Sequence, residues 1–264
     1  MTTDSASLPP LEAIVSLAKK AGLAIMALYN EGNLDVRFKE DVSPVTRADL
    51  AAHRVILAGL QKLTPMFPVL SEESESIPYL ERRDWERYWL VDPLDGTKEF
   101  IKRNGEFTVN IALIVNGEPS LGVVHAPALG RTYSAIQGHG AFRQESSDVR
   151  PQQITVRRGR SQRLKVVVSR SHPGEEAEAF LANLGTYDTV QIGSSLKFCL
   201  VAEGSADLYP RFGPTREWDT AAGHCVLASA GGETTDLDGQ PLRYNKPDLL
   251  NPSFIAKGDP AISS

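Results

Sequence analysis

Residues 88–97 read YWLVDPLDGT, and this stretch says most about how the chain folds. Its first four residues are apolar and predict a strand that ends directly on Asp92. Pro93 has no amide hydrogen and should stop further strand pairing, and Gly96 allows a tight turn. Asp92 and Asp95 can therefore converge at one corner, and such carboxylates suit a hard divalent cation. By itself the motif leaves open a plain turn whose carboxylates are only solvated.

Two more carboxylates could reach the same corner. Glu72 directly follows the apolar run 67–71, so it lies near Asp92 if the two predicted strands are neighbours. Asp219, in the stretch 218–223 (WDTAAG), stands at the start of a predicted helix. Alone it is an ordinary helix N-cap. If it lies opposite the Asp92 corner, it adds a further carboxylate and places the site between two parts of the chain.

Working outward, the first part of the chain is predicted to be two helices on a largely antiparallel sheet. Apolar residues at helical spacing predict helices over 11–29 and 47–63. Thr46 is the expected N-cap of the second helix, with Asp49 three residues on in a capping box. Asn116-Gly117 is a strong hairpin signal. The strands are expected at 67–71, 88–91, 107–115, 121–125 and 132–136.

After about residue 150, predicted strands and helices alternate, which indicates a smaller α/β half. The strands are expected at 164–168, 189–192 and 207–209, and the helices at 175–184, 195–202 and 220–230. We predict an N-terminal α+β half over 1–150 with most of the metal ligands. A C-terminal α/β half over 151–264 would hold the substrate pocket and the last metal ligand. No Ser-, Gly- or Pro-rich linker separates them, so they should share an interface.

Composition limits the function classes. The chain has 264 residues and a net charge of −5, which argues against a general nucleic-acid clamp. The two cysteines, Cys199 and Cys225, lie in apolar runs and are expected to be reduced and buried. No signal peptide or membrane-spanning run is present, so a cytoplasmic protein is expected. Peripheral contact with the cytoplasmic face of a membrane and the oligomeric state are left open.

Taken together, the motifs resemble a known family. Glu72-Glu73, 92–97 and 218–223, in this order and spacing, resemble the lithium-sensitive, magnesium-dependent inositol monophosphatase superfamily. The similarity extends over 11–254, essentially the whole chain. Three more stretches look most like one branch, the CysQ-type 3′(2′),5′-bisphosphate nucleotidases: 98–110, 169–172 and 193–199.

The resemblance implies a fold, a reaction and a cofactor. The fold would be α/β (α+β), a five-layered αβαβα sandwich. The reaction would be hydrolysis of the 3′-phosphate of 3′-phosphoadenosine 5′-phosphate to AMP, with the 5′-phosphosulfate as a second substrate. The cofactor would be Mg²⁺, two or three ions per active site. Glu72, Asp92 and the Leu94 carbonyl would hold one ion, and Asp92, Asp95 and Asp219 another.

Catalytic and substrate-binding roles carry over in the same way. Thr97, paired with Asp49, would orient and activate the attacking water. The alternative for Asp49 is a purely capping role. The substrate would contact Glu72, Leu94, Asp95, Gly96, Thr97, Ser195, Lys197 and Asp219. Further candidates for the second phosphate and the base are Lys39, Arg170, Ser194, His125 and Tyr209.

Two other functions remain open at this stage. An inositol monophosphatase or a sugar bisphosphate phosphatase would share the metal site and differ in the pocket of the second half. A nucleotide-binding sensor without catalysis is a remoter alternative, because every expected ligand and the Thr97–Asp49 pair are present in the sequence.

Overall fold

The computed structural model describes residues 8–31, 37–38, 44–74, 76–159, 163–168 and 175–262. Its helices are α1 (Leu11–Glu31), α2 (Arg47–Leu63), α3 (Tyr79–Arg82), α4 (Thr97–Ile101), α5 (Glu175–Asn183), α6 (Leu196–Ala202), α7 (Glu217–Ser229) and the 3₁₀ turn η1 (Pro127–Leu129).

The strands form three sheets. A short pair is β1 (Arg37–Phe38) with β2 (Pro44–Val45). The large sheet contains β3 (Val69–Ser71), β4 (Arg87–Asp95), β5 (Thr108–Val115), β6 (Glu118–Ala126), β7 (Arg131–Ile136), β8 (Gly140–Glu145) and β9 (Gln152–Ile154), in chain order. The third sheet contains β10 (Leu164–Val168), β11 (Tyr187–Gln191), β12 (Leu208–Arg211), β13 (Glu233–Asp236) and β14 (Phe254–Lys257), in the order β11-β10-β12-β14-β13.

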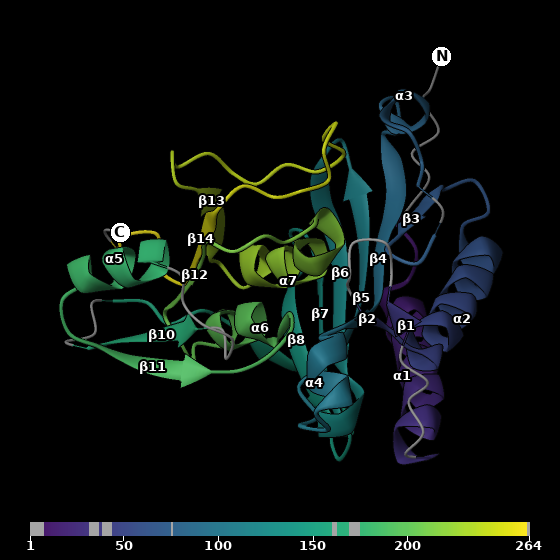
Figure 1. The fold of residues 1–264 in the computed structure, drawn as a ribbon, viewed down its shortest axis with the longest axis horizontal. Coiled ribbons are helices and arrows are strands. Elements are labelled where there is room, and N and C mark those ends of the chain that lie inside the picture. The colour runs from purple at the N-terminus through teal and green to yellow at the C-terminus, as the bar shows by residue number, and fades with distance from the viewer. Residues whose placement is uncertain are drawn as a thin grey trace.

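These elements stack as αβαβα, which confirms the predicted five-layered sandwich (Figure 1). The helices α1 and α2 cover one face of the large sheet, and a buried apolar cluster lies between them. The helices α6 and α7 lie between the two larger sheets and share a second cluster with both. Apolar side chains of α5 pack against β10, β12 and β14 in a third cluster. The middle helix layer therefore connects the sheets through one continuous core.

The order of the large sheet brings two strand ends together. β3 and β4 pair in parallel, with Ser71 opposite Val91, and every other pairing in this sheet is antiparallel. The amide of Glu72 donates to the Val91 carbonyl at 3.1 Å. Because the two strands run the same way, Glu72 and Asp92 follow at the same edge of the sheet. From the sequence, the proximity of Glu72 to Asp92 depended on whether their two strands are neighbours.

Three features predicted from short stretches of sequence are confirmed. Asn116 and Gly117 both have positive φ, 52° and 75°, as a two-residue turn with matching twist requires. The helix α2 begins after Thr46 with the predicted capping box. Cys199 and Cys225 are free and buried.

Two of the boundaries that differ from the prediction bear on the carboxylates. β4 continues through Pro93 to Asp95, because Asp92 pairs with Asn110 and Asp95 pairs with Thr108 across a register shift. The bulge accommodates the missing amide of Pro93, so the proline bends the strand and does not end it. The helix α7 begins at Glu217, so Asp219 is its third residue and not its N-cap.

Several elements were not predicted. The strands β8, β9, β13 and β14 were not predicted from the sequence. The division of the chain at residue 150 stays a prediction, and β9 ends at Ile154 before β10 begins at Leu164. Within the described ranges, no helix combines the length and the apolar character that crossing a membrane needs.

Candidate active site

Three carboxylates from distant parts of the chain meet at one point. Glu72, Asp92 and Asp219 each offer an oxygen atom, and these atoms all lie within 4.8 Å of one another. Glu72 follows β3, Asp92 lies in β4 and Asp219 lies in the first turn of α7. The site therefore forms where the edge of the large sheet meets the start of a middle-layer helix. Such an oxygen-only donor set fits a divalent cation.

Asp95 joins this group through a buried serine. The Ser195 hydroxyl lies 2.8 Å from Asp95 Oδ2 and 2.8 Å from the Asp219 carbonyl oxygen. It accepts a hydrogen bond from Asn110 Nδ2 at 2.8 Å. Ser195 has one proton, so it donates to one of these two oxygens at a time. At 2% exposure it lies beneath the carboxylates and connects β4 to α7. The sequence predicted Ser195 as a substrate contact; its hydroxyl bonds to Asp95 and Asp219, the residue also lines a hollow beside the carboxylates, and the substrate contact stays a prediction.

Burial sets the charge state of the cluster. Desolvation, together with the charges of Glu72, Asp95 and Asp219, raises the pKa of Asp92 well above its usual range. Desolvation and Asp95 raise the pKa of Asp219 to about 8, although the Arg216 amide donates to it. These carboxylates cannot all ionise at neutral pH unless a cation offsets their repulsion. The repulsion among these carboxylates and the geometry of their oxygen atoms therefore both favour a bound metal cation.

Thr97 and Asp49 lie together, as predicted. The Thr97 hydroxyl is 3.4 Å from Asp49 Oδ1 and 3.4 Å from the Leu94 carbonyl. The other carboxylate oxygen of Asp49 accepts from the Thr46 amide at 2.7 Å and the Thr46 hydroxyl at 2.6 Å. One oxygen therefore caps α2 while the other faces Thr97, so the two alternatives for Asp49 are compatible. Burial raises the pKa of Asp49 to about 6.

Gly96 makes this arrangement possible. Its φ of 91° is in the left-handed region, and the turn sets Thr97 as the first residue of α4. A Cβ at this position would lie 3.2 Å from the Glu106 carbonyl oxygen. Both the backbone conformation and the lack of space therefore favour glycine.

Two hollows meet at the carboxylates. One has a volume of about 510 Å³ and contains Glu72, Asp92, Leu94 and Thr97 in its wall. The other has a volume of about 230 Å³ and contains Lys197, Tyr209 and Arg211. Asp95, Gly96 and Asp219 line both. A ligand can therefore reach from the carboxylate cluster into this second hollow, which we call the cationic pocket after Lys98, Lys197 and Arg211, while Asp95, Glu99 and Asp219 also line it.

The cationic pocket depends on a buried lysine. Lys197 is only 8% exposed, and its ammonium donates to the Ser194 carbonyl at 2.7 Å. It lies 5.5 Å from the centre of the Tyr209 ring. Burial lowers its pKa, and the negative charge of Asp95 opposes that shift. Arg211 adds a second cation, with Nε 3.1 Å from the Gly213 carbonyl oxygen.

With this geometry in place, comparison with known proteins identifies the family. The model of the inositol monophosphatase family matches residues 9–262. The chain belongs to the inositol monophosphatase family. The 3′(2′),5′-bisphosphate nucleotidase CysQ of Escherichia coli (strain K12) is 57% identical over 247 residues, covering 92% of this chain and 98% of that protein. The protein of the same name from Buchnera aphidicola is 45% identical over 249 residues, covering 94% and 91%.

Solved structures agree with this membership. The crystal structure of CysQ from Bacteroides thetaiotaomicron, a bacterial member of the family, matches with a TM-score of 0.82 and 44% identity, covering 94% of this chain and 96% of that one. The Thermotoga maritima IMPase matches with a TM-score of 0.77 and 28% identity, covering 94% and 91%. The family fold therefore extends over almost the entire chain.

Some sequence candidates fall elsewhere. His125 lines neither of the two hollows described above: its ring packs against α1, where a Cβ on Gly22 would lie 2.7 Å away, and its Nδ1 is 2.9 Å from the Thr132 hydroxyl. Lys39 and Arg170, with the stretch 169–172, lie outside the described residues. Arg211 was not predicted as a site residue, although it lies only two residues after the candidate Tyr209 and shortly before the motif at 218–223.

Proposed function

We propose that this family member is a magnesium-dependent 3′(2′),5′-bisphosphate nucleotidase. It would convert 3′-phosphoadenosine 5′-phosphate to AMP and phosphate, and the 5′-phosphosulfate would be a second substrate. The observation that carries the proposal is the cationic pocket beside the carboxylates, which can hold a second anionic group of the same molecule. The relatives named 3′(2′),5′-bisphosphate nucleotidase support it. Such an enzyme removes a by-product of sulfur assimilation.

The proposed metal ligands are those the sequence indicated. Glu72, Asp92 and the Leu94 carbonyl would hold one Mg²⁺, and Asp92, Asp95 and Asp219 another. The number of ions, two or three, is part of the proposal. Mg²⁺ bound there would neutralise the phosphate, lower the pKa of a bound water and stabilise the leaving oxygen.

The chain's own residues handle the proton. In the proposed reaction a water gives its proton to Thr97 Oγ1, while the Thr97 hydroxyl proton passes to Asp49 Oδ1. With a pKa of about 6, Asp49 is ionised and available as a base near neutral pH. The water oxygen forms a bond to phosphorus, the P–O3′ bond breaks, the leaving O3′ takes a proton from solvent water, and Asp49 then releases its proton to solvent. The Gly96 and Thr97 amides, at the turn before α4, are proposed to donate to phosphate oxygens.

Metal binding should stabilise the protein, and more strongly at higher pH. Carboxyl groups ionise near pH 4 in an unfolded chain, whereas the pKa of Asp219 is about 8 in the folded protein. Deprotonation therefore lowers stability between about pH 4 and pH 8, and Mg²⁺ restores it by replacing the protons. Mg²⁺ at one fixed concentration, about 100 times its Kd at pH 8, should raise Tm at pH 8 by roughly 5–10 °C. We expect a clearly smaller rise at pH 5.5, with NaCl of equal ionic strength as the control. Equal rises at both pH values would contradict this account of the cluster.

Substrate choice tests the cationic pocket. Lys197→Met should lower kcat/KM for the bisphosphate nucleotide by about 10–100-fold, because it removes a charged hydrogen-bond donor. It should leave the rate on inositol 1-phosphate nearly unchanged. Lys102→Met, at an exposed position after α4, is the matched control. Phosphate release from both substrates measures the effect.

A wild-type rate on inositol 1-phosphate equal to or above that on the nucleotide would support the inositol monophosphatase alternative. Tight nucleotide binding without turnover would support the sensor alternative.

A further inference from the structure

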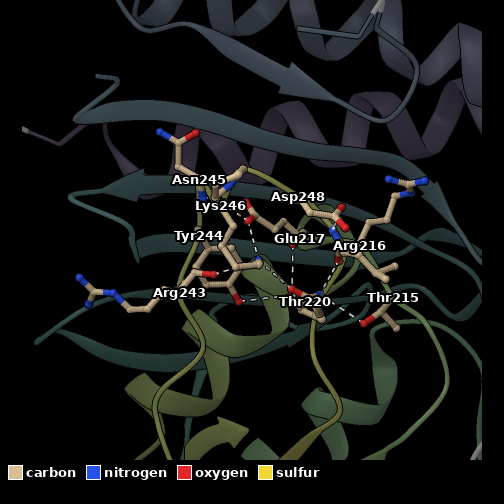
Figure 2. Close-up of polar contacts among 12 residues, drawn as sticks. Thr215, Arg216, Glu217, Thr220, Arg243, Tyr244, Asn245, Lys246 and Asp248 are labelled. Atoms are coloured by element: carbon tan, nitrogen blue, oxygen red, sulfur yellow. Dashed lines mark hydrogen bonds and ion pairs between the residues drawn. The ribbon is translucent and has the colours of Figure 1, made fainter. Parts of the chain in front are cut away.

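A segment near the C-terminus lies across the start of α7. We call residues 243–251 the strap, and its polar contacts with the beginning of α7 are shown in Figure 2. Two backbone–backbone hydrogen bonds and one side-chain bond join it to residues 215–217 at the start of α7. The Glu217 amide donates to the Leu249 carbonyl at 2.9 Å, and the Asn251 amide donates to the Thr215 carbonyl at 2.8 Å. Asn251 Nδ2 donates to the Arg216 carbonyl at 2.8 Å.

The other end of the strap is held by the side chain of Glu217. This carboxylate is completely buried. One of its oxygens accepts from the Asn245 amide at 2.8 Å, and the other accepts from the Lys246 amide at 3.0 Å and the Lys246 ammonium at 2.6 Å. In Figure 2 the Glu217 side chain points toward Asn245 and Lys246. The charge of Glu217 is therefore offset by donors from Asn245 and Lys246 and not by solvent.

A buried arginine fixes the same part of the strap to the first half of the chain. Arg82, at the end of α3, is 2% exposed. It donates to Asn245 Oδ1 at 2.8 Å and to the carbonyls of Lys246 and Pro247 at 2.7 and 3.0 Å. The strap is thus anchored on α3 and cannot shift without breaking buried charged hydrogen bonds, which are costly to leave unmade.

We propose that Glu217 is a positioning residue for Asp219. Burying a carboxylate is expensive and is a weak source of stability even when it is paired. Glu217 lies two residues before Asp219, and it fixes the first turn of α7 against the strap. Within that turn the Arg216 amide holds Asp219 Oδ2 at 2.8 Å, which sets the orientation of the carboxylate toward Glu72 and Asp92. Glu217 is not among the described residues that line the two hollows, whereas Asp219 lines both. An effect of Glu217 on metal binding would therefore pass through the position of Asp219. The inference rests on the metal-ligand role proposed above for Asp219.

The test measures metal binding directly, without turnover. Mn²⁺ is titrated into the full-length protein and free Mn²⁺ is followed by electron paramagnetic resonance. Glu217→Gln preserves size but places an amide group against N–H donors. We expect it to weaken Mn²⁺ binding by about 10–100-fold, as loss of groups that orient metal ligands does elsewhere. Glu203→Gln is the matched control, because Glu203 is a buried carboxylate that accepts from Tyr133 and Arg143 away from the cluster. It should lower Tm and leave Mn²⁺ affinity unchanged.

The outcomes separate this inference from the proposed function. If wild type binds Mn²⁺ and Asp219→Asn does not, but Glu217→Gln binds like wild type, the positioning role is wrong and the proposed function stands. If wild type binds no Mn²⁺, or Asp219→Asn binds normally, the proposed metal site fails and the inference fails with it. Should Glu217→Gln not fold, Lys246→Gln decides, because it removes the ammonium and keeps both backbone donors. Weakened Mn²⁺ binding in that variant supports the positioning role, and wild-type affinity overturns it.

Discussion

Replacing Asp92 with asparagine should lower magnesium-dependent phosphate release by more than about 100-fold, the upper end of what disturbing the surroundings of a metal ligand costs. Asp92 is the carboxylate shared by both proposed ions. It is buried, and an oxygen of its carboxylate lies within 4.8 Å of those offered by Glu72 and Asp219. An amide carries no charge, so both ions would lose attraction at once. Higher Mg²⁺ should restore little of the rate, because no neighbouring group can replace a shared ligand.

The same variant should be more stable than wild type in the absence of metal. The pKa of Asp92 is raised in the folded protein, so ionisation of this side chain opposes folding above about pH 4. Asparagine removes that cost. Urea unfolding in EDTA at pH 8 measures the difference, and Asp188→Asn, at an exposed position on β11, is the control. An Asp92→Asn protein that turns over normally would contradict the shared-ligand role.

Replacing Thr97 with alanine should reduce kcat by about 10²–10⁴-fold, the range for a group that takes part in proton transfer. The Thr97 hydroxyl is placed between Asp49 Oδ1 and the Leu94 carbonyl, and its proposed task is to orient water and pass on a proton. Metal affinity should change little, because the four carboxylates keep their positions. Stopped assays for kcat and Mn²⁺ titration for affinity separate the two effects.

Thr97→Ser is the control for this prediction. Serine keeps the hydroxyl and should recover most of the rate, although without the methyl group its rotamer is less restricted. If Thr97→Ala keeps wild-type kcat, water activation by the Thr97–Asp49 pair is wrong. If it loses metal binding instead, Thr97 supports the ligands and not the water.

Much of the site was predictable because its signals are local. The stretch 88–97 shows two carboxylates where a strand meets a tight turn, and Thr46 with Asp49 forms a capping box visible in four residues. Asp219 was a conditional candidate from its place at a helix start, and the resemblance assigned it as a ligand and paired Thr97 with Asp49. The structure places Asp219 beside Glu72 and Asp92, and the Thr97 hydroxyl 3.4 Å from Asp49 Oδ1.

The remaining features depend on contacts between distant segments. The continuation of β4 past Pro93 depends on Asn110 and Thr108 across the sheet, and a sequence window does not show that pairing. Ser195 was predicted only as a substrate contact, because its bonds to Asn110 and Asp95 join residues 85 and 100 positions away in the sequence. Glu217 lies next to a motif that was recognised, yet its partners are more than 25 residues away in the strap.

The measurement that tests the central claim most directly is ³¹P NMR of 3′-phosphoadenosine 5′-phosphate with the purified protein, with Mg²⁺ and with EDTA. We expect the 3′-phosphate signal to disappear and inorganic phosphate to appear only with Mg²⁺, while the 5′-phosphate of AMP remains. Retention of both phosphate signals with Mg²⁺, loss of the 5′-phosphate first, or equal release in EDTA would contradict the proposed nucleotidase.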